Sequence, residues 1–439
     1  MSAISFTFNW EDPGDAKGEE LRATWASLQI SVDNEVITRV EDLQTKSVRP
    51  HIYIPLYPLA EWIAENWWTL TNEVEAAGRS QFNTYMRRHN LRCAREGFSL
   101  PELMLKPTGS RFYIAWKPAG PDGHRVRFLS EGTEQLDAAA VVEELRKLVS
   151  TVIDRLETRG IMETPLNSEW EGVKISESDE DEKAFCVAAA SLGLDPYDIQ
   201  DEERDTILEA AGALDEDLAA EFFASADSSI LSNELNTLRR LVAEARAMDS
   251  DLAPLRKLKK ELAISIDQRM EPWNQGYEIA RLLRRRIGID TEIIRSMSDF
   301  SRIMNIDSSR FSEALHFFPD KPVCCDALLN VNEKESPAFL LFRQREPHQK
   351  FAFCRGLFEY LVSSRIGAFL ISGSYSDRQK RNRAFAAEFL APASQLKSYL
   401  SGAYVSDEQV DEIADEFNVS PYVIRHQLEN HNLATVLRG

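Results

Sequence analysis

The sequence predicts an α+β protein built from three regions of different character. The first region alternates short apolar and aromatic runs with turn residues, which is typical of strands mixed with helices. The second is rich in Asp, Glu and Ala, and the third combines short apolar runs with amphipathic helices. At 439 residues the chain is long enough for several hydrophobic cores. We therefore expect an N-terminal α+β domain of unknown role at 1–160, an acidic helical middle domain at 161–265, and a C-terminal, mostly helical domain with a small sheet at 266–439.

The N-terminal region is expected to mix short strands with helices. Apolar and polar side chains alternate from Leu21 onward, as in a half-buried strand, whereas Leu59, Trp62 and Ile63 recur at helical spacing. The aromatic group around Trp62 is expected to build the core, and any exposed part of it would be a recognition surface. Strands are predicted at 4–10, 21–32, 36–40, 51–55, 102–106, 111–117 and 124–129, and helices at 59–75, 80–95 and 136–159.

The middle region is dense in carboxylates. Between 163 and 227, only Lys174, Lys183 and Arg204 oppose many Asp and Glu residues. The sequence lacks the D-x-D-x-D-G loop of a calcium site, so we interpret the charge as a solvated helical face. Helices are predicted at 181–192, 202–211, 214–224 and 233–248.

The C-terminal region is expected to place helices around a small sheet. Residues 273–287 form an amphipathic pattern, with Tyr277, Ala280 and Leu283 on one side. Short apolar runs predict strands at 324–330 and 338–342. Further helices are predicted at 350–363, 379–390, 407–417 and 421–429, the last two joined by a short turn.

The composition limits the kinds of partner and the cellular compartment that we expect for this protein. The formal net charge of −20 argues against a general affinity for nucleic acid, because Lys and Arg dominate phosphate binding. Five scattered cysteines are typical of reduced thiols in a cytoplasm. The N-terminus has no basic and apolar signal-peptide pattern, and no uncharged apolar run is long enough to span a bilayer. We expect a cytoplasmic protein with no membrane partner.

Three segments of the C-terminal region resemble the peptidase domain of the ImmA/IrrE family of zinc metallo-endopeptidases. PWNQGYEIARLLRRRIGI is similar to the opening helix of that domain, KFAFCRGLFEYL stands where its active-site helix belongs, and NRAFAAEFLAP is similar to the segment that closes its active site. The tail FNVSPYVIRHQL follows them. The resemblance covers 266–439 and implies a zincin-like fold for this region.

The zinc site that the resemblance implies is degenerate in this chain. Such a site needs two histidines at i and i+4 on one helical face, a carboxylate at i+1 and a third protein ligand. The aligned histidine positions hold Arg355 and Glu359, the general-base position holds Gly356, and the third-ligand position holds Arg381. A guanidinium group has no lone pair for zinc, and a glycine is no base. We therefore expect no catalytic residue, no metal and no cofactor.

The replaced residues have two interpretations. Arg355 and Glu359 are four residues apart and share one face of the predicted helix. If that face points inward, they form a charged bridge with Arg381 in place of the metal. If it points outward, all three are ordinary surface charges.

Two basic runs stand out from the acidic background, at 281–286 and 378–383. They are solvated helix faces or the rim of a groove that binds an acidic partner segment or nucleic acid. The candidate partner-binding residues are Arg284, Arg285, Arg378, Lys380, Arg381 and Arg383.

Active members of the family cleave or inactivate repressor-type proteins in stress-response, mobile-element and phage-defence settings. The resemblance implies a regulatory pseudoprotease that binds a protein partner without zinc proteolysis. Two alternatives stay open: an active zinc metallo-endopeptidase that cleaves a repressor-type protein, and a nucleic-acid-associated effector that uses the basic runs.

Overall fold

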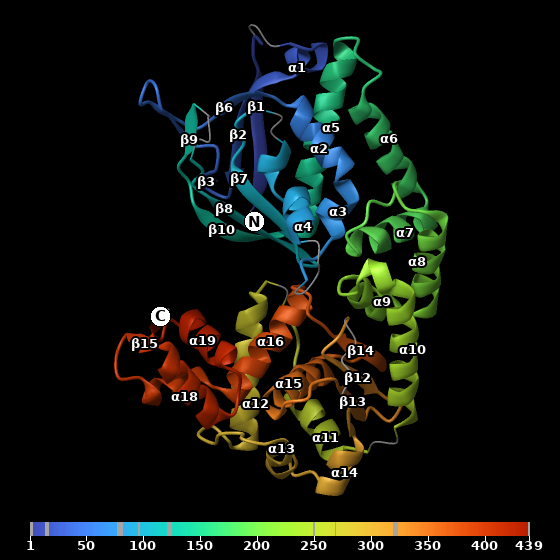
Figure 1. Ribbon diagram of the computed structural model, residues 1–439, viewed down its shortest axis with the longest axis vertical. Helices are drawn as coiled ribbons and strands as arrows, with labels where there is room; N and C mark the ends of the chain where they lie inside the picture. Colours follow the sequence, from blue (N-terminus) through green and yellow to red (C-terminus); the bar gives the residue numbers. More distant parts are fainter. Residues whose placement is uncertain are drawn as a thin grey trace. The chain divides into compact units, whose positions relative to one another are not determined.

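The computed structural model describes residues 3–13, 17–76, 82–94, 97–120, 125–248, 251–267, 269–318 and 324–437. The chain divides into two compact units, Met1–Ala213 (unit 1) and Leu214–Gly439 (unit 2). Each unit combines helices with small sheets, so the predicted α+β class is confirmed (Figure 1). The region 161–265 runs across the boundary between the units, and its definition as a separate domain stays a prediction.

Unit 1 contains three small antiparallel sheets. In the first, β2 (Trp25–Val32) pairs with β1 (Ile4–Trp10), β3 (Glu35–Val36) and β6 (Ile52–Pro55). Alternate residues of β2, such as Leu28 and Ile30, are fully buried, on the face opposite to the one predicted by the alternation from Leu21 through Trp25. The second sheet has the order β10-β8-β7 and the third the order β5-β4-β9. Their strands are β4 (Val40–Asp42), β5 (Val48–Arg49), β7 (Glu102–Pro107), β8 (Arg111–Lys117), β9 (Val126–Phe128) and β10 (Gly132–Asp137).

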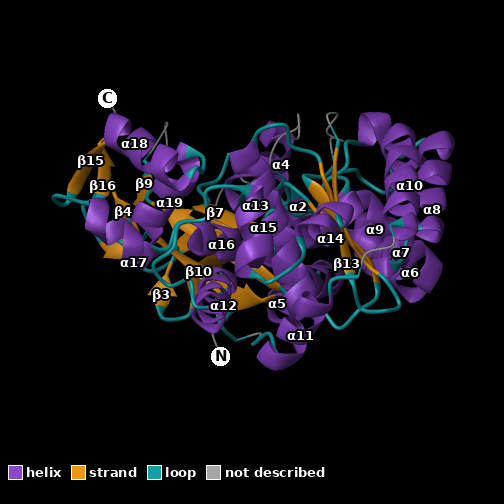
Figure 2. Cartoon of the chain, turned by 90° about the horizontal axis from the view of Figure 1, so that it is seen from below, coloured by secondary structure: helices purple, strands orange, loops and turns teal. Residues whose placement is uncertain are grey.

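The helices of unit 1 pack on these sheets and on one another. The long helix α5 begins after Asp137, whose carboxylate accepts a hydrogen bond from the Ala140 amide as an N-cap. Helices α6, α7 and α8 lie side by side in Figures 1 and 2. The helices are α1 (Glu19–Ala23), α2 (Tyr57–Glu65), α3 (Trp67–Asn72), α4 (Phe82–His89), η1 (Leu91–Ala94), α5 (Ala138–Thr158), α6 (Pro165–Ser178), α7 (Glu180–Ser191) and α8 (Asp201–Ala213).

Several predicted elements of unit 1 differ from the structure. The strand predicted at 21–32 begins with the short helix α1, and the strand predicted at 36–40 is mostly a turn between β3 and β4. The helix predicted at 59–75 is two helices, because the chain turns at Asn66, whose amide donates to the Trp62 carbonyl. Helix α6 and strand β10 were not predicted. Residues 80, 81, 95 and 124 of predicted elements lie outside the described residues.

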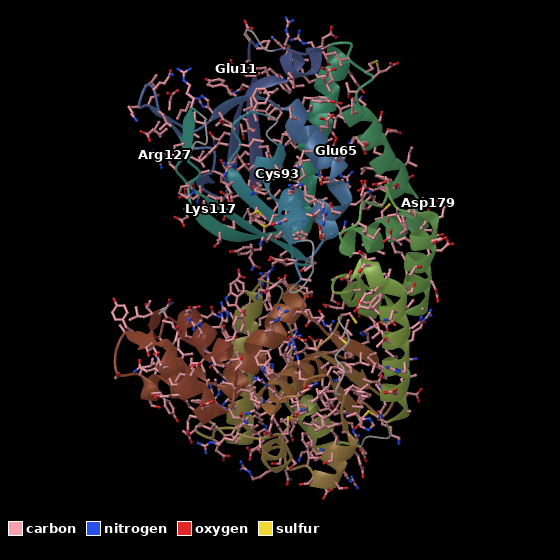
Figure 3. The ribbon with its side chains drawn as sticks, viewed as in Figure 1. Glu11, Glu65, Cys93, Lys117, Arg127 and Asp179 are labelled. Carbon is pink, nitrogen blue, oxygen red and sulfur yellow. The ribbon has the colours of Figure 1, made fainter. Side chains whose placement is uncertain are left out.

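The tryptophans of the aromatic group belong to the core of unit 1, whereas Tyr53, just upstream of them, is 44% exposed. Trp62, Trp67 and Trp68 are 8%, 2% and 5% exposed, which excludes these side chains as a recognition surface. The ring of Trp67 meets that of Trp170 edge to face at 4.9 Å. Of the five cysteines, all free thiols, Cys93 on unit 1 is the exposed one (Figure 3).

Unit 2 is organised around a four-stranded sheet with the order β11-β13-β12-β14. Strand β11 runs parallel to β13, and the remaining pairs are antiparallel. Every residue of β12 and β13 is buried, because α15 and α10 both pack against these strands. The strands are β11 (Leu315–Phe317), β12 (Ala327–Val331), β13 (Pro337–Leu341) and β14 (Gly367–Ile371).

Two close helix contacts define the rest of unit 2. Helix α16 packs against α15 and, along much of its length, against α12. Gly276 makes the second contact possible, since a Cβ there would clash with the Arg381 carbonyl oxygen and the Ala384 side chain. The helices are α9 (Glu216–Phe223), η2 (Ser228–Ile230), α10 (Leu231–Ala247), α11 (Ala253–Leu262), α12 (Pro272–Ile287), α13 (Met297–Ile303), α14 (Ser308–Glu313), α15 (Glu346–Val362), α16 (Asp377–Leu390), α17 (Ala393–Leu396) and η3 (Lys397–Tyr399).

The C-terminal tail is the predicted helix, turn and helix. Helix α18 (Asp407–Phe417) ends at Asn418, which adopts the left-handed conformation with φ 46°, and α19 (Pro421–Asn430) follows. Strands β15 (Tyr404–Ser406) and β16 (Thr435–Leu437) pair in parallel beside them. Across the described part of both units, no helix is long and apolar enough to cross a bilayer.

Candidate functional site

The candidate site lies between α15 and α16, where the resemblance places a metal. Ser376 caps α16 by accepting a hydrogen bond from the Gln379 amide, and this fixes where the helix begins. Apolar contacts hold the two helices together, among them the rings of Phe358 and Phe385 with centroids 5.4 Å apart. Arg355 and Glu359 are only 2% and 3% exposed, so the inward-facing interpretation of these residues is the one that the structure supports.

Arg355 is a buried guanidinium with four hydrogen bonds. Its Nε donates to Asn382 Oδ1 at 2.7 Å, and its Nη1 donates to Asp326 Oδ2 at 2.9 Å. Its Nη2 donates to the Ser372 carbonyl at 2.7 Å and to Gln379 Oε1 at 2.6 Å. Burial lowers the pKa of Arg355 to about 9, so the side chain remains charged at neutral pH.

Glu359 is held by two side chains of α16. Asn382 Nδ2 donates to Glu359 Oε1 at 3.0 Å, and Arg378 Nε donates to Glu359 Oε2 at 3.0 Å. Asn382 therefore stands between Arg355 and Glu359, accepting from one and donating to the other. The two charges of α15 are joined through an amide rather than through a metal.

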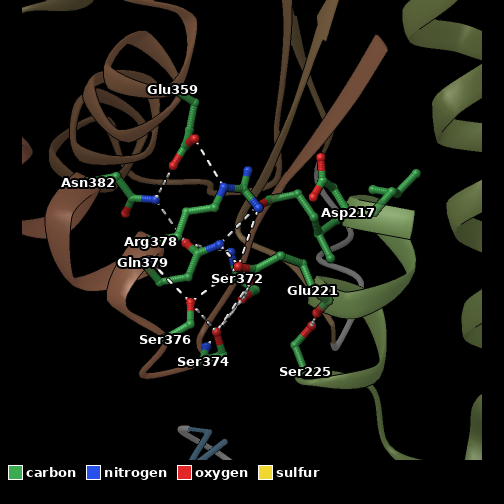
Figure 4. Close-up of polar contacts among 12 residues, drawn as sticks. Asp217, Glu221, Ser225, Glu359, Ser372, Ser374, Ser376, Arg378, Gln379 and Asn382 are labelled. Atoms are coloured by element: carbon green, nitrogen blue, oxygen red, sulfur yellow. Dashed lines mark hydrogen bonds and ion pairs between the residues drawn. The ribbon is translucent and has the colours of Figure 1, made fainter. Parts of the chain in front are cut away.

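Arg378 connects this pair to a second carboxylate, Glu221 of α9. Its Nη1 lies 3.3 Å from Glu221 Oε1, and Figure 4 shows Arg378 reaching between Glu359 and Glu221. Burial opposes the charge of Arg378, but the two carboxylates outweigh it and raise the pKa of Arg378 above its usual value. The cation is therefore firmly held in the network.

Glu221 is itself surrounded by donors. Gln379 Nε2 donates to Glu221 Oε2 at 2.9 Å, and the hydroxyl groups of Ser372, Ser374 and Ser376 lie between 3.2 and 3.4 Å from its two oxygens (Figure 4). Hydroxyl and amide donors of this kind stabilise a buried carboxylate. The result is a closed polar network across α9, β14, α15 and α16.

Arg381 and Gly356 have other roles than the alignment suggested. Arg381 Nε donates to the Asp377 carbonyl of its own helix, while Arg378 and Asn382 contact Glu359. Positions 378 and 382 are one helical turn apart and face α15, whereas the main chain at Arg381 faces α12. Gly356 is a packing position, since a Cβ there would lie 3.1 Å from the Phe339 ring.

The two candidate arginines of α12 lie in different environments, one buried and one exposed. Arg284 is 2% exposed and donates to the carbonyls of Phe389, Ile289 and Glu292, so it is a structural cation and not part of a partner-binding surface. Burial lowers the pKa of Arg284 to about 10. Arg285 is exposed on α12.

On α16, Lys380 lies 3.9 Å from Asp377 and is part of an ion pair within the helix. Arg383 is half-buried and donates to the Ser374 carbonyl at 2.5 Å. The basic residues at 378–383 therefore have different partners. Arg378 belongs to the closed network, Lys380 and Arg381 contact Asp377 of their own helix, and Arg383 lies at the edge of the network.

Of the network residues, sequence reasoning identified only Arg355, Glu359 and Arg378 as candidates. The segment S-x-S-x-S-x-x-Q-x-x-N, from Ser372 to Asn382, carries a signal: hydroxyls on every second residue, then amides one helical turn apart. Glu221 and Asp326 carry no such local signal, because they come from distant parts of the chain.

The residues between α15 and α16 do not fit zinc. The aligned ligand positions hold two arginines and one carboxylate, and that carboxylate is already bound by Arg378 and Asn382. Within the described ranges, no group of three or more His, Cys, Asp or Glu residues is arranged to hold a metal. No protein-family model matches the chain, and no curated protein matches it either.

Proposed function

We propose that this chain is a catalytically degenerate ImmA/IrrE-like regulator that binds a protein partner in the cytoplasm without zinc proteolysis. The resemblance of α12, α15 and α16 to the family supplies the scaffold for this proposal. The family setting implies a role in stress response or phage defence, with a repressor-type protein as the partner class.

The observation that carries the proposal is the buried Arg355 guanidinium. It occupies a position that the family gives to a metal-binding imidazole, and all four of its neighbouring acceptors belong to this chain. A cation at this place repels a metal ion, and removing it would leave buried acceptors unsatisfied. The chemistry of a zincin is therefore incompatible with this packing, while the surface of the domain stays available for binding.

Metal analysis tests the first part of the proposal. The full chain, purified without chelator, is expected to carry far less than one zinc per molecule, and Glu359→Gln is expected to leave that value unchanged. Zinc near one per chain that is lost in Glu359→Gln would favour the active metallo-endopeptidase.

Capture of the product of an adjacent gene tests the second part. The partner is expected to bind and to stay intact over hours, with or without chelator. Cleavage that a chelator stops would overturn the pseudoprotease. Salt-dependent affinity for DNA or RNA without partner binding would instead favour the nucleic-acid-associated effector.

A further inference from the structure

A cationic and aromatic surface adjoins the closed network of unit 2. We call it the Arg383 surface. Its members come from the segment after β13, from the start of α15, from the loop before α16, and from α16 and α19: Arg343, Arg345, His348, Tyr375, Arg383 and Tyr422.

Two arginines of the Arg383 surface, Arg343 and Arg383, lie close to Asp326. Asp326 is bound by Arg343 at 2.5 Å and by the buried Arg355 at 2.9 Å, and Arg383 also interacts with it electrostatically. His348 is exposed at the same place, and burial together with Arg343 and Arg345 lowers its pKa. Arg343, Arg345, Arg355 and Arg383 lie here with the carboxylates of Asp326 and the exposed Glu346, while Glu221, which also acts on Arg383, is bound by Arg378. Positive charge therefore exceeds negative charge, in a chain whose total is −20.

Exposed aromatic side chains complete the surface. Tyr375 and Tyr422 are 38% and 66% exposed. The Arg383 guanidinium lies 5.0 Å from the centre of the Tyr375 ring, and the ring of Tyr422 lies 4.1 Å from that of His426. Arginine and tyrosine are the residues that most often anchor protein interfaces.

The buried network holds this surface in a fixed geometry. Arg383 donates to the carbonyls of Ser372 and Ser374, and Asp326 is fixed by Arg355 from the interior. A surface whose side chains are already ordered loses little conformational entropy on binding. The degenerate site thus supports the surface from behind instead of performing chemistry.

Resting on the function proposed above, we propose that the Arg383 surface binds an acidic segment of the protein partner. Carboxylates of that segment would pair with Arg343, Arg345 and Arg383, and its apolar side chains would pack on Tyr375 and Tyr422. Arg355 itself is buried and does not contact the partner.

A short acidic protein segment fits the surroundings better than a nucleic acid. Helix α18, which packs against α19, exposes a row of carboxylates: Glu408, Asp411, Glu412 and Asp415. A polyanion long enough to reach α18 would be repelled by this row, whereas a short segment bound at Arg383 and Tyr422 need not reach it.

Fluorescence anisotropy with the full chain tests the proposal. The probes are a labelled oligoglutamate peptide and a labelled single-stranded oligodeoxynucleotide of the same length. Arg345→Glu changes an exposed charge and is expected to weaken peptide binding by at least about tenfold, since a like charge then faces the peptide. Arg240→Glu, an exposed arginine of α10, is the matched control and is expected to bind like wild type.

Tyr422→Ala is a second variant on the same surface. It is expected to weaken binding of the captured partner more than binding of the oligoglutamate peptide, because that peptide has no apolar side chains. Equal peptide affinity in wild type and Arg345→Glu, or tighter binding of the oligonucleotide than of the peptide, would overturn the proposal.

Capture of the partner separates this inference from the function on which it rests. An intact partner that binds wild type and Arg345→Glu equally well contradicts the Arg383 surface and leaves the pseudoprotease in place. A partner that is cleaved contradicts the pseudoprotease itself.

Discussion

Two buried ionic clusters, one in each unit, differ in how far apart in the sequence their members lie. In unit 1, Glu73 accepts from Arg88 at 2.9 and 2.7 Å and lies 3.2 Å from His89 Nε2, so its partners are near neighbours in sequence. In unit 2, Arg355 draws on Asp326, Gln379 and Asn382, and the connected Glu221 lies more than a hundred residues earlier in the chain.

The difference concerns what each cluster stabilises. The Glu73 cluster ties the end of α3 to the end of α4, and His89 also lies 2.8 Å from the Leu105 carbonyl of β7. The Arg355 cluster fixes four elements that the chain brings together only when unit 2 is complete. Loss of Arg355 should therefore cost more, because four hydrogen bonds to groups from separate elements are lost at once.

The largest effect is expected for Arg355→Met. This change removes the donor of the buried Asn382 Oδ1 and one of the donors of Asp326 and of Gln379 Oε1. We expect the free energy of unfolding of unit 2 to fall by about 3–5 kcal/mol. Urea denaturation followed by circular dichroism measures it. Arg240→Met, at an exposed site, is expected to stay within about 0.5 kcal/mol of wild type. A loss below about 1 kcal/mol for Arg355→Met would show that the network is not a main support of the unit.

A smaller loss of unfolding free energy is expected for Glu221→Gln. The substitution keeps the shape of the side chain and most of its hydrogen bonds, while Arg378 keeps Glu359 as its partner. We expect a loss of about 1–3 kcal/mol, measured in the same way. If the loss equalled that of Arg355→Met, Glu221 rather than Arg355 would be the centre of the network.

The matching change in unit 1 is Glu73→Gln. Arg88 is 14% exposed and can turn toward water, so we expect a loss of about 1–2 kcal/mol, less than for Arg355→Met. Hydrogen exchange of α3 and α4 locates the effect in unit 1. Increased hydrogen exchange across unit 2 would contradict the claim that the Glu73 cluster stabilises unit 1 alone.

The Glu73 cluster should also lose stability in acid. Burial raises the pKa of Glu73, but His89 and Arg88 outweigh it and hold the pKa below its usual 4.5. A depressed carboxyl pKa contributes stability that is present above about pH 4.5 and is lost as the pH falls through the folded-state value. We expect unit 1 of wild type to lose stability in this window, and Glu73→Gln to lose less. Identical acid transitions for the two proteins would contradict this.

The smallest effect on stability, close to zero, is expected from removing metal with a chelator. Because the α15–α16 site holds charges of its own in place of a metal, EDTA is expected to shift the Tm by less than about 1 °C. Thermal unfolding with EDTA and with added zinc measures it. A clear drop that zinc reverses would mean that unit 2 is stabilised by a metal after all.

The local elements were largely predictable because their signals are local. The amphipathic pattern at 273–287 predicts α12 to within one residue, and the pattern at 379–390 predicts most of α16. The turn at Asn66 was missed because the residues on both sides continue the helical pattern, and only the capping amide of Asn66 ends α2.

The sequence by itself determined the α+β class, the helices α12, α15 and α16, and the absence of histidine between His348 and His426. Only the tertiary structure decided which charges meet. Helical phase places Arg378 and Asn382, not Arg381, against Glu359, and α9 delivers Glu221 from a distant part of the chain. The physical reason is that periodicity shows which face of a helix is buried, whereas the partner of a buried charge depends on how separate elements pack.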